Sequence, residues 1–442
     1  MLPMKRASWA VAALLAWPVL AAPPAWLSNA VIYEVFPRDF SASGDLNGVT
    51  AGLDRLHALG VDVIWLMPIH PIGQVKRKGT LGSPYSVRDY YAIDPEYGTK
   101  DDLKRLVAAA HARGMKVIID IVANHTSWDS VMMQTPAFYK HNAAGRIIPP
   151  VPDWEDVAAL DYGNPQLRTY MIDMLRYWIH DFDLDGFRCD AASMVPVSFW
   201  ESARDALDQT KPGLLMLAEA HDPPLMKKAF DLDYAWPLHS TLAALFSKGE
   251  PARDLRTSWM EEREQFPKGT LHMRISDDHD EERAIVRFGK GGALAASALM
   301  FTLDGVPLLY EGMEAGDTAE SGAPALFEKL PVFWQIAERR PEFPRFYAAM
   351  IALRHAHPAL QQGETEWLRN SDDARVVTYM RRGAGEEFLV AINFSNRPFM
   401  GLVDAAGSGY AEVTPGVEHG AAITLPALSL DAWGYRVFRR SR

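Results

Sequence analysis

The chain has 442 residues, of which 48% are hydrophobic and 23% charged, the balance of a folded globular protein long enough for more than one domain. Its 45 Lys and Arg residues are outnumbered by 56 Asp and Glu residues. The formal net charge of -11 argues against nucleic acid or an anionic membrane surface as the main partner. The single cysteine, Cys189, excludes an intramolecular disulfide framework.

The N-terminus has the pattern of a secretory signal peptide. Lys5 and Arg6 precede an apolar run over residues 7–20, and two alanines follow it. The run is short for a membrane span, which favours a cleaved signal peptide. An uncleaved membrane anchor is the alternative interpretation. We therefore expect residues 1–22 to be removed, and the chain to be exported to the periplasm or the medium with no stable membrane anchor.

From residue 30 to residue 355, short β-branched runs alternate with amphipathic stretches. One helix is expected after the capping residue Thr99, and another after Asn164 with Pro165 in its first turn. Eight strands are expected, at residues 30–36, 61–67, 115–122, a run ending at 190, 214–218, 230–234, 271–276 and 306–310. This alternation requires parallel strands with crossover helices, so the sequence predicts an α/β fold, a closed (β/α)8 TIM barrel.

The pattern changes after a last barrel helix expected at residues 346–355. Strand-like runs with Gly- and Pro-containing turns follow at residues 376–380, 387–393, 421–425 and 434–438. They predict a C-terminal antiparallel β-sandwich domain at residues 361–442. The barrel is then expected to comprise residues 23–125 and 157–360, with residues 126–156 forming a short insertion after strand three.

Three acidic residues at the ends of expected strands are candidates for chemistry. Asp190, Glu219 and Asp280 end strands four, five and seven, and the carboxyl ends of barrel strands meet at one mouth. Side chains alternate along a strand, so Arg188 points the same way as Asp190. Cys189 between them points away from the site and is expected to pack against neighbouring side chains. A guanidinium beside a carboxylate favours the ionised form of the carboxyl group.

These strand ends resemble, as a set, the four signature regions of the α-amylase family of glycoside hydrolases. The matching segments are residues 120–125, residues 186–190, Glu219 with its apolar approach, and the pair His279-Asp280. Three further segments resemble motifs of the family: residues 160–162, Tyr85 followed by Asp89-Tyr90, and residues 305–312. The resemblance covers nearly the whole chain after the expected signal peptide.

The resemblance implies a role for each of the three acids. Asp190 would be the nucleophile that forms a covalent glycosyl-enzyme, and Glu219 the acid that protonates the leaving oxygen and then the base that activates water. Asp280 would bind ring hydroxyls and help to distort the sugar. Such a retaining mechanism implies carboxyl groups roughly 5–5.5 Å apart.

The resemblance also implies contacts to the sugar. Tyr85, in the motif that contains Asp89, would stack under the ring, and His125 and His279 would hydrogen-bond the same sugar. Arg188 would hold Asp190 in its charged form.

Calcium is the metal that the resemblance implies, and no organic cofactor is expected. Asn124 matches a calcium ligand of the family. However, Ser193 and Met194 stand where many α-amylases carry Lys and His, which removes a usual sugar contact and weakens the expected metal site. Acids in the short insertion that could assist are Asp129, Asp153 and Glu155.

Substrate specificity depends on weaker signals. Lys76, Arg77 and Lys78 lie after strand two and are best interpreted as a solvated basic turn, with a clamp on the substrate as the alternative. At least one tryptophan is expected to stack on glucose units, and the candidates are Trp128, Trp154, Trp236 and Trp334.

The sequence as a whole predicts a monomeric retaining hydrolase of α-1,4-glucans or maltooligosaccharides. A transglycosylase or isomerase of the same family, of the glucanotransferase or trehalose synthase type, is the first alternative, because a sugar can intercept the same intermediate. A non-catalytic glycan-binding barrel is the second alternative. The three intact acids argue against it.

Overall fold

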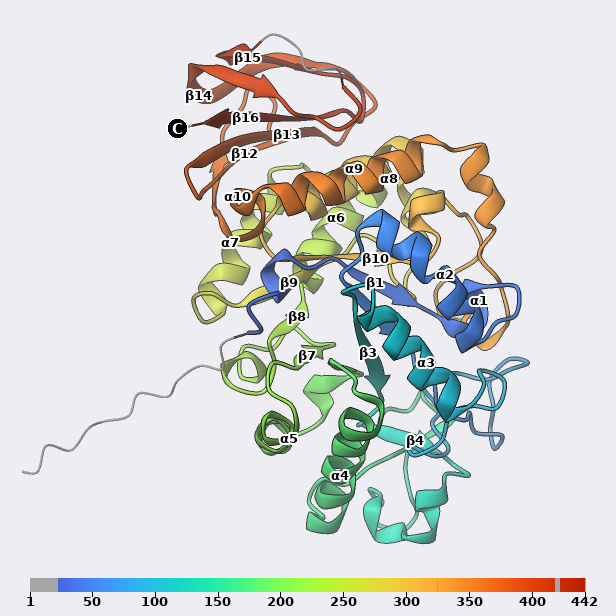
Figure 1. The fold of residues 1–442 in the computed structure, drawn as a ribbon. Helices are drawn as coiled ribbons and strands as arrows, with labels where there is room; N and C mark the ends of the chain where they lie inside the picture. Colours follow the sequence, from blue (N-terminus) through green and yellow to red (C-terminus); the bar gives the residue numbers. More distant parts are fainter. Residues whose placement is uncertain (1–22, 324, 418–421, 442) are drawn as a thin grey trace, which may run out of the picture.

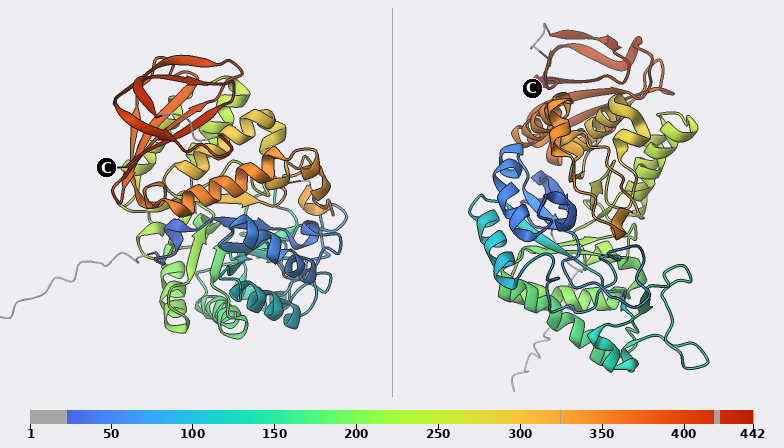
Figure 2. Two further views of the ribbon diagram at one scale, coloured as in Figure 1. Left: turned by 45° about the horizontal axis from the view of Figure 1, so that its top comes forward. Right: turned by 90° about the vertical axis from the view of Figure 1, so that its right-hand side faces the viewer.

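The computed structural model describes residues 23–323, 325–417 and 422–441, so the expected signal peptide lies outside the described residues. A closed barrel of parallel strands carries an antiparallel β domain near the C-terminus (Figure 1). The β domain lies against α8, α9 and α10, and the insertion that contains β4 lies at the other end of the molecule (Figures 1 and 2).

The eight expected strands of the barrel are all present, which confirms the predicted (β/α)8 fold. Around the barrel they follow the order β1-β10-β9-β8-β7-β6-β3-β2. In chain order they are β1 (Ile32–Val35), β2 (Val63–Leu66), β3 (Lys116–Ile121), β6 (Gly186–Cys189), β7 (Leu215–Ala218), β8 (Leu232–Tyr234), β9 (Leu271–Arg274) and β10 (Val306–Tyr310).

Alternation along these strands produces two cores. Trp65, Leu217 and Met273 belong to a core that fills the barrel, whereas Phe187 and Cys189 belong to the core between strands and helices. Cys189 is therefore buried by packing on the outer side of the strand, as its position between Arg188 and Asp190 predicts.

The helices surround the barrel and begin largely where the sequence predicts. Thr99 caps α3 with a capping box, and Asn164 caps α4 with Pro165 at its first position. The helices are α1 (Pro37–Phe40), α2 (Leu46–Leu59), α3 (Lys100–His111), α4 (Pro165–Phe182), α5 (Val197–Thr210), α6 (Trp236–Lys248), α7 (Asp254–Gln265), α8 (Ala284–Thr302), α9 (Glu342–Ala356) and α10 (Pro358–Gln362).

The helix α8 is the one helix in the described part of the chain that is long and apolar enough to cross a membrane. Of its most apolar stretch, 61% is buried inside the protein. It packs against α9, α6 and strand β13 of the C-terminal domain.

The segment after β3 is anchored by a two-stranded antiparallel ribbon. The strands β4 (His125–Ser127) and β5 (Val157–Ala159) pair through His125 with Ala159. Short 3-10 turns at Val131–Gln134 and Pro136–Phe138 lie between them. The ribbon therefore fixes both ends of the insertion beside the barrel mouth.

The described residues of the C-terminal domain form six strands, in the order β11-β12-β13-β16-β14-β15. The long strand β14 folds over so that β14 and β15 cover β12, β13 and β16, with a separate apolar core between them (Figure 1). The strands are β11 (Glu364–Leu368), β12 (Val376–Gly383), β13 (Glu386–Asn393), β14 (Phe399–Glu412), β15 (Ile423–Leu430) and β16 (Tyr435–Ser441). The sequence interpretation omitted β11 and β14.

Candidate active site

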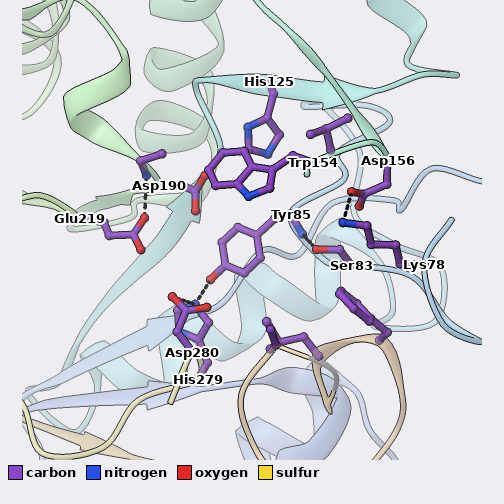
Figure 3. A pocket seen from close by; sticks show the side chains of 15 residues that line it. Lys78, Ser83, Tyr85, His125, Trp154, Asp156, Asp190, Glu219, His279 and Asp280 are labelled. Carbon is purple, nitrogen blue, oxygen red and sulfur yellow. Dashed lines mark hydrogen bonds and ion pairs between the residues drawn. The ribbon is translucent and has the colours of Figure 1, made fainter. Parts of the chain in front are cut away.

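A cavity of about 240 Å³ opens at the carboxyl ends of the barrel strands, and Figure 3 shows its lining. All three acids predicted from the strand ends reach it: Asp190 follows β6, Glu219 follows β7 and Asp280 lies beyond β9. The predicted residues Tyr85, His125 and His279 line it too. The structure thus brings together residues from distant parts of the chain.

Arg188 lies fully buried below the cavity and contacts three carboxylates. Its Nη1 donates to Asp120 Oδ2 at 2.9 Å and to Asp190 Oδ1 at 3.2 Å, and its Nη2 lies 3.0 Å from Glu219 Oε1. One planar guanidinium therefore holds Asp190 and Glu219 through its two terminal nitrogens. Such sharing brings the two acids side by side.

The pKa of Asp190 differs from the expectation drawn from Arg188 alone. Burial and the neighbouring carboxylate of Glu219 raise the pKa of Asp190 well above its usual range, and Arg188 opposes them by lowering it. Asp120 adds to the increase, and its own pKa is raised by burial to about 6. The positive charge of Arg188 therefore does not offset the effect of burial on Asp190 and Asp120.

Glu219 is fixed at both oxygens. Its Oε2 accepts a hydrogen bond of 2.7 Å from the backbone N–H of Ala191, while Oε1 faces Arg188. Ala191 follows Asp190 directly and has a left-handed φ of 43°, an unfavourable conformation for a residue with a side chain. This turn after Asp190 is what aims an N–H at Glu219.

Tyr85 and His279 form a stacked pair on the cavity wall. Their ring centroids lie 5.3 Å apart, and Tyr85 Oη lies 2.8 Å from His279 Nε2 and 3.1 Å from Asp120 Oδ2. The other ring nitrogen of His279 lies 2.5 Å from Oε1 of the buried Glu34 on β1. Burial lowers the pKa of His279, but Asp280 and Glu34 outweigh it and raise the value to about 10.

His125 and Trp154 line the upper side of the cavity in Figure 3, and Asp280 lies on the opposite side beside His279. The His125 ring meets Trp154 edge-on at 5.5 Å, and burial lowers the pKa of His125 to about 4, so its imidazole is neutral near pH 7. The Asp280 side chain is 41% exposed and lies 3.4 Å from His279 Nε2. A ligand in the cavity thus meets a neutral ring, an indole and a solvated carboxylate.

Lys78 fits the alternative interpretation of the basic turn, a clamp on the substrate, better than the favoured one. It lines the cavity, where Nζ lies 3.1 Å from Asp156 Oδ1 of the insertion. The other two basic residues do lie outside, since Lys76 covers the Trp128 ring and Arg77 bonds to the Gly73 carbonyl. Leu326 and Phe327, which the sequence did not single out, complete an apolar side of the cavity.

One further expectation about contacts needs correction, and the choice among the tryptophans becomes narrower. Asp89 does not line the cavity: its Oδ1 accepts from the N–H of Tyr91 and stabilises a turn. Of the four candidate tryptophans only Trp154 lines the cavity, because the others pack against Lys76, Tyr234 and Arg55.

The residues expected to hold calcium do not converge. The side-chain nitrogen of Asn124 lies 3.3 Å from His125 Nδ1 and 3.7 Å from the Met194 sulfur, and neither is a ligand that calcium prefers. Asp129 accepts from the N–H of Gln74 instead, and Asp153 and Glu155 are exposed. The donor set around Asn124 therefore does not fit calcium.

Comparisons with known proteins agree with this geometry. The sequence profile of the family described as alpha amylase, catalytic domain, matches residues 32–144 and 152–338. Alpha-amylase MalA from Haloarcula japonica is 30% identical over 419 residues, which cover 90% of this chain and 60% of that protein. This chain thus spans less than two thirds of the length of that relative.

For two further relatives, the match with this chain covers a larger share of their length. A cyclomaltodextrinase from Geobacillus thermopakistaniensis is 26% identical over 94% of this chain and 77% of that protein. The crystal structure of a noncanonic maltogenic alpha-amylase, AmyB from Thermotoga neapolitana, superimposes with a TM-score of 0.86 at 29% identity. That match covers 94% of this chain and 99% of the other.

Proposed function

Because the chain belongs to the α-amylase family of glycoside hydrolases, we propose that it hydrolyses α-1,4-glucosidic bonds of starch-like glucans or maltooligosaccharides with retention of configuration. One observation carries the proposal: Arg188 holds Asp190 and Glu219 together at the floor of a cavity walled by Tyr85 and His279. Inverting glycosidases keep their two carboxyl groups apart to admit a water molecule between them and the sugar. A shared guanidinium favours the closer spacing of a retaining pair.

In the first proposed step, the ionised carboxylate of Asp190 attacks the anomeric carbon. The glycosidic C–O bond breaks as Glu219 transfers its proton to the leaving oxygen, which leaves a glycosyl ester on Asp190. Arg188 and the N–H of Ala191 hold Glu219 in place. A water molecule then loses a proton to Glu219 and attacks the same carbon, which frees Asp190.

The surrounding residues are suited to the charge that develops on the sugar. Tyr85 presents its ring beside Asp190 (Figure 3), and Asp280 offers a carboxylate to ring hydroxyls. Arg188 is buried and does not line the cavity, so its charge would not contact the substrate directly. The site therefore surrounds an oxocarbenium-like transition state with anionic and aromatic groups.

The names of two relatives support short or cyclic maltooligosaccharides as substrates, since one is a cyclomaltodextrinase and another a maltogenic amylase. Trp154, Lys78 and Phe327 line the same cavity and would contact the glucose units of such a substrate.

The experiment follows products and anomers after incubation with maltoheptaose, β-cyclodextrin, starch, pullulan, sucrose and trehalose. We expect shorter maltooligosaccharides that appear first as the α anomer in NMR spectra. Longer products would indicate transglycosylation, β anomers would exclude retention, and an unchanged set of substrates would favour a glycan-binding protein.

Variants test the assignment of the nucleophile. Asp190→Asn should abolish turnover while it leaves maltooligosaccharide binding largely intact. A 5-fluoro glucosyl fluoride should label the wild-type peptide that contains Asp190, detected by mass spectrometry. Asp181→Asn on the surface of α4 is the matched control and should retain both turnover and maltooligosaccharide binding. Substantial turnover by Asp190→Asn would refute the mechanism.

A further inference from the structure

A second group of ligand-type side chains lies outside the barrel wall, away from the catalytic cavity. His221 follows β7, Glu262 lies in the last turn of α7, and His272 lies on β9. One side-chain nitrogen or oxygen of each lies within 4.8 Å of the other two. Glu262 and His272 are buried, and the His221 side chain is 14% exposed. None of the three lines the catalytic cavity.

Both imidazoles are oriented through Nδ1. His221 Nδ1 lies 3.1 Å from the Tyr234 carbonyl oxygen, and His272 Nδ1 lies 2.5 Å from Asp233 Oδ1. An acceptor at Nδ1 keeps the proton there, which leaves a lone pair on Nε2. This is the arrangement in which proteins present histidines to metal ions.

The two Nε2 atoms lack hydrogen bonds that would use those lone pairs. Buried His221 Nε2 has no hydrogen-bond partner among the described residues. His272 Nε2 lies 3.8 Å from Glu262 Oε1, beyond hydrogen-bond distance. The buried Nε2 of His221 faces this group without a donor, which is unfavourable unless a cation or a water molecule lies there.

Arg274 orients Glu262 without consuming its coordinating capacity. Its Nη1 donates to Oε2 at 2.9 Å, and its Nη2 lies 2.8 Å from Oε1. Each carboxylate oxygen has two lone pairs, so Oε1 keeps one for a metal. The pairing with Arg274 also offsets part of the negative charge in the empty cluster.

An ion can reach the cluster from solvent. A surface cavity of about 290 Å³ is lined by Glu262 and His272, with Arg263, Lys268 and Asp304 nearby, and His221 lies behind it rather than in its lining. The cavity is separate from the catalytic one, and the two share no lining residue. It supplies both an entry path and room for a water ligand.

We propose that His221, Glu262 and His272 bind one divalent transition-metal ion, with zinc the best match. Two imidazole nitrogens and one carboxylate oxygen suit zinc, and water would complete a tetrahedron. Zinc–ligand bonds of about 2.0–2.2 Å require the three side chains to move inward by a small rotation. The ion would join α7, β9 and the segment after β7, and so stabilise this side of the barrel.

Metal binding by the intact chain is the first test. Untagged full-length protein is stripped with a chelator and titrated with Zn²⁺ by calorimetry and with Co²⁺ by visible absorption. We expect one equivalent of zinc, a higher Tm with zinc than without it, and the absorption bands of a four-coordinate Co²⁺ with imidazole ligands. Failure to bind zinc stoichiometrically, or a Co²⁺ spectrum typical of six oxygen ligands, would overturn the proposal.

Variants place the ion. His221→Gln and Glu262→Gln should each weaken zinc affinity at least tenfold and remove the increase in Tm. His70→Gln is the matched control: His70 is buried, its Nδ1 contacts the Ala92 carbonyl and its Nε2 has no hydrogen-bond partner in the described structure, but it belongs to no such cluster. It should bind zinc like the wild type. Unchanged affinity in both cluster variants would refute the site, and the Co²⁺ spectrum of the wild type tests it even if they fail to fold.

Discussion

The carboxylate of Glu34 lies 2.5 Å from Nδ1 of His279, and both side chains are buried. The second ring nitrogen, Nε2, lies 2.8 Å from Tyr85 Oη, so a protonated imidazole donates at both ends. Burial lowers the pKa of His279, but Asp280 and Glu34 raise it to about 10, whereas an unperturbed histidine has a pKa of about 6.5.

This ion pair makes stability depend on pH. Because the folded-state pKa of His279 is raised, its contribution to the free energy of unfolding is fully present below about pH 6.5 and is lost as pH rises through about 10. The free energy of unfolding measured in urea should therefore decline between about pH 6.5 and 10. This decline should be smaller in His279→Gln. Glu34→Gln should lower the pH at which the His279 ring titrates by NMR. A His279 that titrates near pH 6.5 in the wild type would contradict this, and His57→Gln, at an exposed position, is the control.

Asp120 is predicted to shift the acid limb of the pH–activity profile to higher pH through its effect on the pKa of Asp190. Burial first, then Glu219 and Asp120, raise the pKa of Asp190, and only the ionised form of Asp190 can act as a nucleophile. Asp120→Asn removes one of these carboxylates and leaves more of Arg188 to Asp190. The acid limb of kcat/KM should therefore move to lower pH. The measurement is kcat/KM from pH 3 to 8, and a limb that stays fixed or moves upward would exclude Asp120 from this role.

The sequence predicts the barrel and the three acids because both depend on local patterns. Alternation of strands and helices specifies the closed sheet, and the carboxyl ends of its strands bring Asp190, Glu219 and Asp280 together. The partner of His279 lies 245 residues away in sequence on β1, so that pairing exists only once the barrel closes. The shared use of Arg188 depends in the same way on the spatial order of three strands.

Where the structure differs from the sequence interpretation, the physical cause is again a contact or an arrangement that local sequence does not reveal. Lys78 looks solvated within its own basic turn, because its partner Asp156 belongs to the insertion after β3. Strand β14 was missed because glycines interrupt it and because Met400 and Leu402 point into solvent, which breaks the apolar alternation. Asp89 fits a motif, but a side chain that stabilises its own turn does not face the cavity.

Trp154 is predicted to bind substrate through its indole ring. It lines the cavity next to His125, whereas Trp367 on β11 is a half-buried tryptophan in the C-terminal domain. Trp154→Ala should raise KM for maltoheptaose about tenfold, or about 1.4 kcal/mol, with kcat nearly unchanged. Trp367→Ala should leave KM as it is in steady-state assays. Equal KM values in Trp154→Ala and the wild type would remove the indole from the binding surface.

Lys78 is expected to affect binding more than stability. Its ammonium group pairs with Asp156 at 3.1 Å, but the side chain is 37% exposed, so the ion pair should contribute less than about 1 kcal/mol to the free energy of unfolding. Lys78→Met should raise KM, because the pair fixes the insertion over the cavity. Lys76→Met, whose ammonium lies over Trp128 instead, is the control. Urea unfolding and steady-state kinetics separate the two effects, and a large loss of stability without a change in KM would contradict the prediction.

Gly186 is required at the start of the strand that carries Arg188 and Asp190. It has a φ of +145°, and a Cβ built on it would lie 2.0 Å from the Leu215 carbonyl oxygen on β7. Backbone cannot yield as a flexible side chain can, so Gly186→Ala should lower the free energy of unfolding by about 3 kcal/mol or more. Gly114→Ala, with φ +76° and no heavy atom within 4 Å of the added Cβ, should cost only about 1 kcal/mol. Because a displaced β6 moves both Arg188 and Asp190, kcat of Gly186→Ala should fall further than its folded fraction, measured by circular dichroism at the assay temperature. Equal losses of stability in the two variants would show that β6 and β7 can separate without cost.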